Sequence, residues 1–172
     1  MPTLEGRFRK RKKPVNGSWR MDETYIKVKG RWVYLYRAFD KCGDTIDFML
    51  RAKRDKRAAK AFFKKAIKSS GQPTKVNIDK SGSNTAALNS INKPLSKEDQ
   101  IEIRHNKYLN NRIEEDHRFI KKRTNTMLGL KSFRSAAKTI AGIELLHMIK
   151  KRQLANNNNY NSVFDKFLSL AA

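Results

Sequence analysis

Three consecutive β-like runs constrain the fold of this chain more than any other feature of its sequence. They occupy residues 19–28, 32–39 and 45–50, and aromatic and β-branched side chains dominate them. The breaks between the runs, at Lys29-Gly30 and at residues 41–44, are short. Connections of this length join antiparallel neighbours, so we predict a sheet that begins with two hairpins.

The periodicity then changes from that of strands to that of helices. Asp55 can cap a helix whose apolar residues recur in pairs every four positions from Ala58 to Ile67. Because a strand that follows a helix usually lies parallel to a neighbour, the next β-like run should be a parallel strand. The order of elements predicts an α/β fold of the ribonuclease H-like, or retroviral integrase-like, kind: a mixed five-stranded sheet flanked by helices. The later elements are a strand at 76–79, a helix at 84–91, a strand at 101–105, a helix from Asn110 and a helix at 133–154.

The charge of the chain points to a polyanionic partner. Its 172 residues include 39 Lys and Arg against 16 Asp and Glu, a formal net charge of +23. Nucleic acid is the first candidate partner and an acidic membrane surface the second. No apolar run is long enough to span a bilayer and no signal peptide precedes the domain, so we expect a cytoplasmic protein without membrane association. The single cysteine, Cys42, excludes an internal disulfide and a thiolate metal cluster.

We divide the chain into three parts. Residues 1–18 hold a block of like charge beside Gly and Pro, which predicts a basic flexible arm. Residues 19–154 form the ribonuclease H-like domain, and residues 155–172 form an Asn-rich tail that ends in at most one short amphipathic turn. The arm either tracks DNA phosphates, which we favour, or only keeps the protein in solution. Its candidate DNA contacts are Arg9, Lys10, Arg11 and Lys12.

Acidic residues on three separate elements are the main sign of chemistry. One lies within the first strand, one ends the strand at 76–79, and a third group opens the helix at Asn110. Three carboxylates from three elements suit a two-metal phosphoryl-transfer site, since hard divalent cations prefer oxygen ligands. On that helix Glu114, Arg118 and Lys121 share one face. Taken alone, such a stretch is more often a capped, solvated helix start with a salt-bridged face than a catalytic element.

Several linked motifs resemble the DDE transposases of bacterial insertion sequences, and more narrowly insertion sequence family six. The resemblance runs from about residue 18 to residue 153 and includes the spacing between the second Asp and the Glu. The motifs are Trp-x-x-Asp-Glu-Thr-Tyr at 19–25, Gly-x-Trp-x-Tyr-Leu-Tyr-Arg-Ala-x-Asp at 30–40, Asp79-Lys80, His105, Tyr-x-Asn-Asn-x-Ile-Glu-x-Asp-His at 108–117, and the matching runs at 128–133 and 140–144.

The resemblance implies a metal-binding triad of Asp22, Asp79 and Glu114, with Lys121 as the basic residue two turns after the Glu. It also implies Mg²⁺ or Mn²⁺ as cofactor, with two ions in the site. Lys80, Arg118, Lys121 and Lys122 join the arm as expected DNA contacts.

Other residues near the triad compete for these roles. Glu23 adjoins Asp22, but neighbours on a strand point to opposite faces, so we expect only one of them at the site. Glu115 and Asp116 are turned away from the face that Glu114 shares with Lys121. His117 is a candidate metal ligand or DNA neighbour, but we expect it, like His105, to be a hydrogen-bonded structural histidine. We expect Trp19 and Trp32 to lie in the core rather than to stack on bases.

The function that follows from the resemblance is that of a DNA transposase catalytic domain acting on double-stranded DNA as a homo-oligomer. It would hydrolyse a phosphodiester at an element end and transfer the 3′-hydroxyl into target DNA. The family carries a helix-turn-helix segment before the first Asp, and only the basic arm stands there in this sequence, so we expect a truncated transposase whose activity alone is in doubt. The alternatives are a ribonuclease H-like nuclease and a catalytically silent DNA-binding remnant.

Overall fold

The computed structural model describes residues 4–80, 82–106, 111–125, 130–155 and 162–171; within α4, the side chains of residues 111–116 and 125 lie outside the description. A five-stranded sheet with the strand order β3-β2-β1-β4-β5 forms its centre. The strands are β1 (Ser18–Val28), β2 (Arg31–Asp40), β3 (Thr45–Arg51), β4 (Lys75–Asn77) and β5 (Glu102–Arg104). The first three strands are antiparallel, whereas β4 lies parallel to β1 and β5 parallel to β4. The predicted mixed sheet is confirmed.

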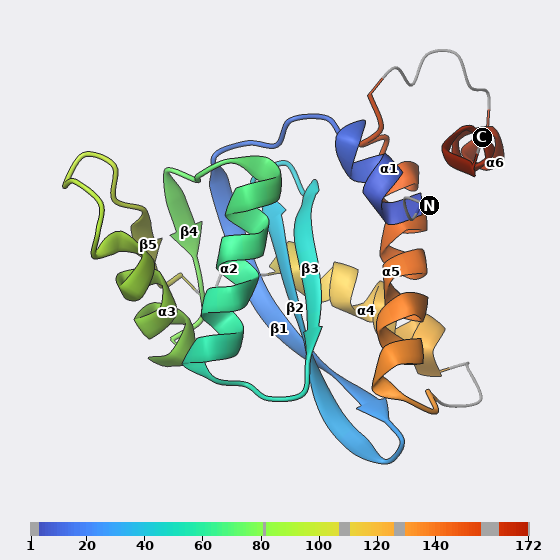
Figure 1. The fold of residues 1–172 in the computed structure, drawn as a ribbon, viewed down its shortest axis with the longest axis horizontal. Coiled ribbons are helices and arrows are strands. Elements are labelled where there is room, and N and C mark those ends of the chain that lie inside the picture. Colours follow the sequence, from blue (N-terminus) through green and yellow to red (C-terminus); the bar gives the residue numbers. More distant parts are fainter. Residues whose placement is uncertain (1–3, 81, 107–110, 126–129, 156–161, 172) are drawn as a thin grey trace.

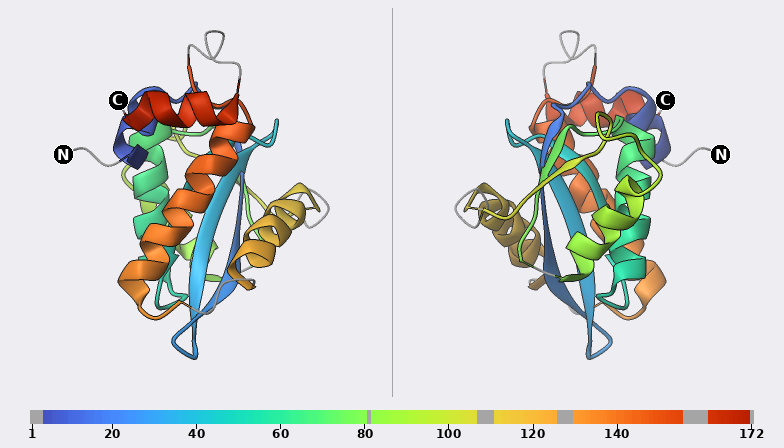
Figure 2. Two further views of the ribbon diagram at one scale, coloured as in Figure 1. Left: turned by 90° about the vertical axis from the view of Figure 1, so that its right-hand side faces the viewer. Right: turned by 90° about the vertical axis from the view of Figure 1, so that its left-hand side faces the viewer.

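Helices cover both faces of this sheet (Figures 1 and 2). The helices α2 (Lys56–Ser70) and α3 (Gly82–Asn92) lie on one face and α4 (Asn111–Asn125) lies on the other. Asp55 caps α2 as predicted, since its side chain accepts a hydrogen bond from the Ala58 amide at 2.7 Å. Long α5 (Phe133–Lys150) runs past the β3 side of the sheet, with α1 (Leu4–Lys10) and α6 (Val163–Ala171) against its C-terminal half.

The alternation of strand side chains divides the core into two clusters. Met21 of β1 and Tyr36 of β2 pack with the phenylalanines of α2, whereas Ile26 of β1 and Leu35 of β2 pack with residues of α4 and α5. Each strand of the first hairpin therefore contributes to both clusters.

The N-terminal segment differs from the flexible arm expected from its charge. Leu4–Lys10 is helical, and Phe8 is fully buried in the cluster that α5 supports. Arg9 forms two hydrogen bonds with the buried carboxylate of Asp47, at 2.6 and 3.1 Å, and Lys12 donates to the backbone oxygen of Ile46. The arm is fixed because its charges have acceptors in the domain, which a count of like charges along the sequence does not reveal.

The C-terminal segment is also more ordered than expected. Residues 162–171 include the nine-residue helix α6, and Leu170 on this helix is buried beside α1. Arg7 and Arg11 of the N-terminal segment donate to backbone oxygens of Leu170 and Ser169. The two ends of the described chain thus stabilise each other. The run 156–159, expected to be outside the core, lies outside the described residues.

Candidate active site

The first acidic pair of the site stands on β1 at the point where its pairing with β4 ends. β4 pairs only with Ser18–Arg20, so the edge of β1 is uncovered by β4 from Met21 onward. Asp22 and Glu23 follow directly on this open edge, and Asp79 lies two residues beyond the end of β4. The topology therefore brings acids from two parallel strands to one edge of the sheet, where open α/β sheets commonly bind ligands.

The carboxylates of Asp22, Glu23 and Asp79 converge. One oxygen of each lies within 4.8 Å of one oxygen of the other two, which is close enough for shared contact with a metal ion. The expectation that only one of Asp22 and Glu23 could face the site is wrong. Strand neighbours do point to opposite faces, but at an uncovered edge both side chains can bend around the strand and meet.

An arginine occupies the space between two of these acids. Arg54, in the loop before α2, lies 3.1 Å from an oxygen of Glu23 and 3.2 Å from an oxygen of Asp79. Asn84 at the start of α3 donates to the other oxygen of Asp79 at 3.3 Å. The remaining Glu23 oxygen, Oε1, is buried and has no hydrogen-bond partner among the described residues. Carboxylate oxygens held this closely, one of them unpartnered, are a donor set that fits a hard divalent cation.

The raised pKa values of the site acids indicate that their ionised forms lack sufficient compensating positive charge. The pKa of Asp22 is raised to about 6, chiefly by burial and also by the neighbouring Glu23 and Asp79, while a backbone hydrogen bond and Arg54 act in the opposite direction. Burial also raises the pKa of Glu23. Crowded, partly buried carboxylates bind protons more readily than free ones, and a cation bound between them would reverse that effect.

The helix that carries Glu114 packs against β1. His117 of α4 is buried, and its Nδ1 lies 4.0 Å from Oδ2 of Asp22. Burial lowers the pKa of His117 to about 3, with smaller contributions from Arg37 and Lys121, so the imidazole is neutral at pH 7. Glu114 stands one turn before His117 on α4, but its side chain lies outside the described residues, as do those of Glu115 and Asp116.

A buried ion pair lies beside Asp22 on the neighbouring strand. Arg37 is the cross-strand partner of Asp22 in the β1–β2 register. It donates to both oxygens of Glu144 on α5, at 2.6 and 3.1 Å, and both side chains are fully buried. In the sequence, the one indication of this ion pair is Arg37, a charged residue within the aromatic run of β2. Glu23 is a rival of Asp22 because the two are adjacent, whereas Arg54 carries no comparable indication. Arg37, Glu144 and Arg54 were not predicted to belong to the site.

The basic residues predicted to contact DNA fall into two groups. Lys10, Lys80, Arg118, Lys121 and Lys122 are exposed. Arg9, Arg11 and Lys12 instead use hydrogen-bonding groups of the protein, as described above. His105 is exposed, with its Nδ1 3.3 Å from the backbone oxygen of Asp79, and Trp19 lies in the core as expected.

Comparison with known proteins places this arrangement in a family. The DDE-domain family typified by IS240 matches residues 16–153. Two Staphylococcus aureus proteins, the transposase for the insertion sequence-like element IS431mec and the transposase for insertion sequence element IS257 in transposon Tn4003, are each 41% identical over 151 residues. These matches cover 88% of this chain and 66% of each relative, so the chain spans about two thirds of the relatives' length.

Solved structures share the fold. A simian T-cell lymphotropic virus intasome chain superposes with a TM-score of 0.55 at 19% identity, over 76% of this chain and 48% of that one. The catalytic core domain of the HTLV-2 integrase, solved in complex with magnesium, superposes with a TM-score of 0.51 at 21% identity, over 65% and 72% of the two chains. The expected resemblance and the integrase-like fold are confirmed, and the chain belongs to the DDE-domain family of insertion-sequence transposases.

Proposed function

We propose that this chain is the catalytic domain of a DNA transposase, which hydrolyses a phosphodiester at the ends of an element and transfers the resulting 3′-hydroxyl into target DNA. The observation that supports this most is the convergence of Asp22, Glu23 and Asp79 within 4.8 Å at one sheet edge, in a member of the DDE-domain family. The alternative of a nuclease would use the same carboxylates, and only the second, joining reaction separates the two.

The proposed metal ligands are Asp22, Asp79 and Glu114, and the geometry adds Glu23 as a fourth candidate. Bound divalent cations, which we propose to be two Mg²⁺ or Mn²⁺ ions, would lower the pKa of the attacking water and neutralise charge on the scissile phosphate. The acids would hold these ions, which would in turn bind the reacting phosphate, and we propose that Lys121 on α4 contacts a neighbouring phosphate. No covalent enzyme intermediate is required.

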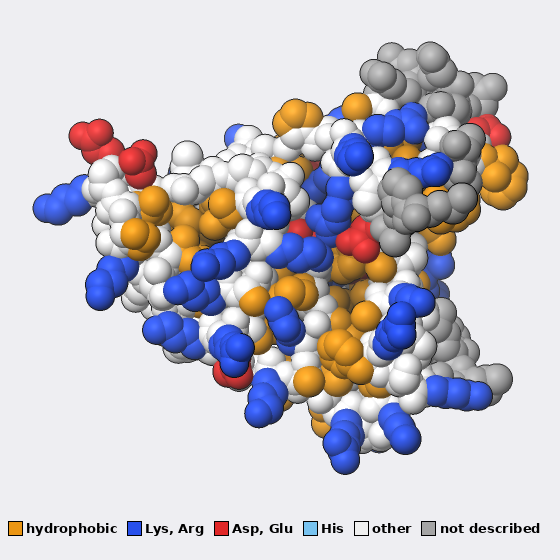
Figure 3. All heavy atoms as spheres, viewed as in Figure 1, with side chains coloured by type: hydrophobic (Ala, Val, Ile, Leu, Met, Phe, Trp, Pro, Cys, Tyr) orange, Lys and Arg blue, Asp and Glu red, His pale blue; other side chains and the backbone are white. Residues whose placement is uncertain are grey.

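Double-stranded DNA is the proposed partner. The formal charge of +23 favours a polyanion, and Lys and Arg side chains are spread over the face shown in Figure 3, where few Asp and Glu side chains appear. Exposed Lys10, Lys80, Arg118 and Lys122 are the proposed phosphate contacts outside the site. We also propose a homo-oligomer on DNA and a cytoplasmic location. Within the described residues no helix combines the length and the apolar character that crossing a membrane requires.

One observation favours a different candidate, a catalytically silent DNA-binding protein. Arg54 forms ion pairs with Glu23 and Asp79, so a cation can reach these oxygens only if the guanidinium moves. Should Arg54 hold its position in the presence of metal, the site stays closed. The side chain is about one-third exposed, which leaves it room to swing toward solvent.

The experiment that tests the proposal is a two-stage assay with Mg²⁺ or Mn²⁺. Nicking of supercoiled plasmid reports hydrolysis, and joining of a labelled 3′-end to a target duplex reports strand transfer. Wild type should do both, Asp79→Asn should lose both, and Glu98→Gln should do both, because Glu98 is an exposed acid on the loop between α3 and β5. Nicking without joining identifies a nuclease. Equal activity of Asp79→Asn and wild type would rule out the proposed site.

A further inference from the structure

A cluster of aromatic side chains on the β1–β2 hairpin is exposed, contrary to the expectation that Trp32 lies in the core. Trp32 is 60% exposed and Tyr25 is 48% exposed. The strand register pairs Tyr25 with Tyr34 and Lys27 with Trp32, so all four side chains lie on one face of the hairpin. Ring centroids are 5.5 Å apart for Tyr25 and Tyr34 and 6.4 Å apart for Tyr25 and Trp32. The rings contact one another, and Tyr34 also packs against the core cluster that α2 supports, whereas Tyr25 and Trp32 remain about half exposed.

The turn of this hairpin fixes where the aromatic cluster lies. Lys29 and Gly30 have φ values of 48° and 78°, and two successive residues with positive φ are typical of the tight type I′ turn. Such a turn fixes the register of the two strands that it joins. Trp32 is therefore exposed at a defined position on a regular strand and not in an irregular loop. The core has a tryptophan of its own, Trp19, which is 1% exposed.

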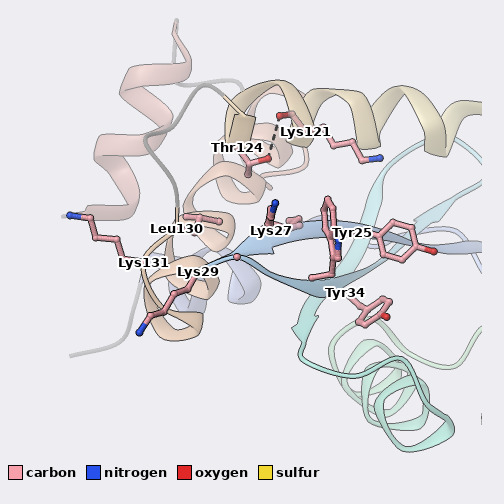
Figure 4. Close-up of a pocket in the computed structure, with 11 residues that line it drawn as sticks. Tyr25, Lys27, Lys29, Tyr34, Lys121, Thr124, Leu130 and Lys131 are labelled. Atoms are coloured by element: carbon pink, nitrogen blue, oxygen red, sulfur yellow. Dashed lines mark hydrogen bonds between the residues drawn. The ribbon is translucent and has the colours of Figure 1, made fainter.

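The aromatic cluster forms one wall of a hollow of about 1170 Å³ (Figure 4). Lys121 and Thr124 of α4 also line the hollow and lie above the strand that carries Tyr25, whereas the Tyr34 ring points away from α4. Lysines are the only charged side chains in the described lining: Lys27, Lys29, Lys121 and Lys131. A hollow lined by flat aromatic faces and by ammonium groups, without a carboxylate, is complementary to an anionic ligand with planar groups.

The size of the hollow and its lining residues restrict the class of ligand further. Its volume is above the range of about 300–1000 Å³ that is usual for drug-sized ligands, so more than one planar group can enter. Proteins that bind single-stranded nucleic acid combine a basic groove with aromatic side chains on which bases stack. A base inside a duplex cannot offer its face to a side chain, so only unpaired nucleotides can use both features of this hollow.

We propose that this hollow binds unpaired nucleotides of a DNA strand, with bases stacked on Tyr25 and Trp32 and phosphates held by the surrounding lysines. The link between this hollow and the cleaved bond rests on the proposed function. Tyr25 follows Asp22 by three residues, about 10 Å along β1, and Lys121 follows Glu114 by two helical turns, about 10 Å along α4. Because β1 and α4 both extend from the hollow to the acidic site, the DNA strand bound in the hollow would be the one next to the cleaved bond.

Binding of a labelled oligothymidylate, followed by fluorescence anisotropy in EDTA, tests the proposal without any catalysis. Removing one stacking side chain should weaken binding about tenfold, so we expect that loss for Trp32→Leu and for Tyr25→Leu. Trp32→Phe should retain most of the affinity, since it keeps an aromatic face. The matched control is Phe164→Leu, which removes an aromatic side chain that is 67% exposed on α6 and should leave affinity unchanged.

A second comparison separates unpaired nucleotides from bare charge. A duplex with a single-stranded overhang should bind wild type more tightly than a blunt duplex with the same number of phosphates, and Trp32→Leu should abolish that difference. Equal binding of the two duplexes to wild type, or equal oligothymidylate affinity of Trp32→Leu and Phe164→Leu, would overturn the proposal. Displacement of the oligonucleotide by polyglutamate of equal charge with equal efficiency would also overturn it, since the lysines alone would then explain binding.

The outcome is independent of the test of the proposed function. Nicking and joining depend on metal and on Asp79, whereas these titrations exclude metal and leave the carboxylates intact. If the protein does not cut DNA but prefers an overhang in a Trp32-dependent way, the nucleotide-binding proposal stands. In that case the proposed transposase function is wrong. A protein that cuts and joins DNA but shows no such preference keeps the transposase assignment and lacks the proposed nucleotide-binding site.

Discussion

At the scale of single residues, the chemistry of the site depends on how Asp22 is held. It lies between Glu23 and Asp79 on one side and His117 on the other, and Arg37 stands opposite it on β2. His117 stays neutral because it is buried near cations, so it does not neutralise the carboxylate. A bound metal ion would supply the missing positive charge, and without one the ionised form of Asp22 is costly.

This cost predicts a pH dependence of stability in the metal-free protein. The pKa of Asp22 is about 6 in the folded state and 3.8 for a free side chain, so the folded state binds the proton more tightly. The stability of wild type should therefore fall as the pH rises from about 4 to 7, and Asp22→Asn should lack this loss. We expect Asp22→Asn to gain about 2 kcal/mol on wild type across that range, a value reduced for partial solvent exposure.

Urea unfolding in EDTA at several pH values measures this difference. Comparison of the two proteins cancels the titration of His117, whose lowered pKa acts in the opposite sense by favouring the folded state as the pH rises. A constant difference between the variants from pH 4 to 7 would show that Asp22 is not perturbed.

Motifs that fixed both residue type and spacing predicted that Asp22 and Asp79 lie together, and the structure brings them together, while their role as metal ligands stays a prediction. The positions of Asp22 and Asp79 at one sheet edge follow from an acid in the first strand and another at the end of a parallel strand. Glu23 was excluded by an alternation rule that holds for strands covered on both sides. Arg54 lies in a loop among many other basic residues, and only the folded chain shows which of them contacts an acid.

At the scale of elements, strands and amphipathic helices were predictable because their own side-chain periodicity defines them. The helix α2 shows the paired apolar residues and the Asp55 cap in its sequence, and both are present in the structure. The helix α1 is different, because seven residues are too few for a stable isolated helix. Phe8, Arg9 and their distant partners stabilise it, and such tertiary contacts leave no local pattern.

The C-terminal helix α6 offers a matched test of these tertiary contacts. Leu170 is 1% exposed and packs near α1 and α5, whereas Leu168 on the same helix is 48% exposed. Leu170→Ala should lower the free energy of unfolding by about 2 kcal/mol, the lower end for a buried leucine, because a terminal helix can adjust to a cavity. Leu168→Ala should change it by less than about 0.5 kcal/mol. Chemical denaturation decides between them, and equal effects would mean that α6 does not dock as described.

At the scale of the whole molecule, a strongly basic chain carries a small acidic site. The chain carries a net charge of +23, yet three of its 16 acidic residues meet at one edge of the sheet. Basic residues on the surface favour DNA of any sequence, since phosphate contacts carry no base information. The carboxylates then need a metal ion before they can lie next to a phosphate, because like charges would otherwise repel. Metal and DNA should therefore bind to this molecule cooperatively at the acidic site.

The central claim is that Asp22 and Asp79 belong to a divalent-cation site, and thermal unfolding in the presence and absence of Mg²⁺ or Mn²⁺ tests it most directly. A cation that binds only the folded state raises the melting temperature in proportion to its affinity. We predict a clear, concentration-dependent rise for wild type and for the exposed-acid control Glu98→Gln, and a much smaller rise for Asp79→Asn. An equal metal-induced rise in Asp79→Asn and wild type would contradict the account.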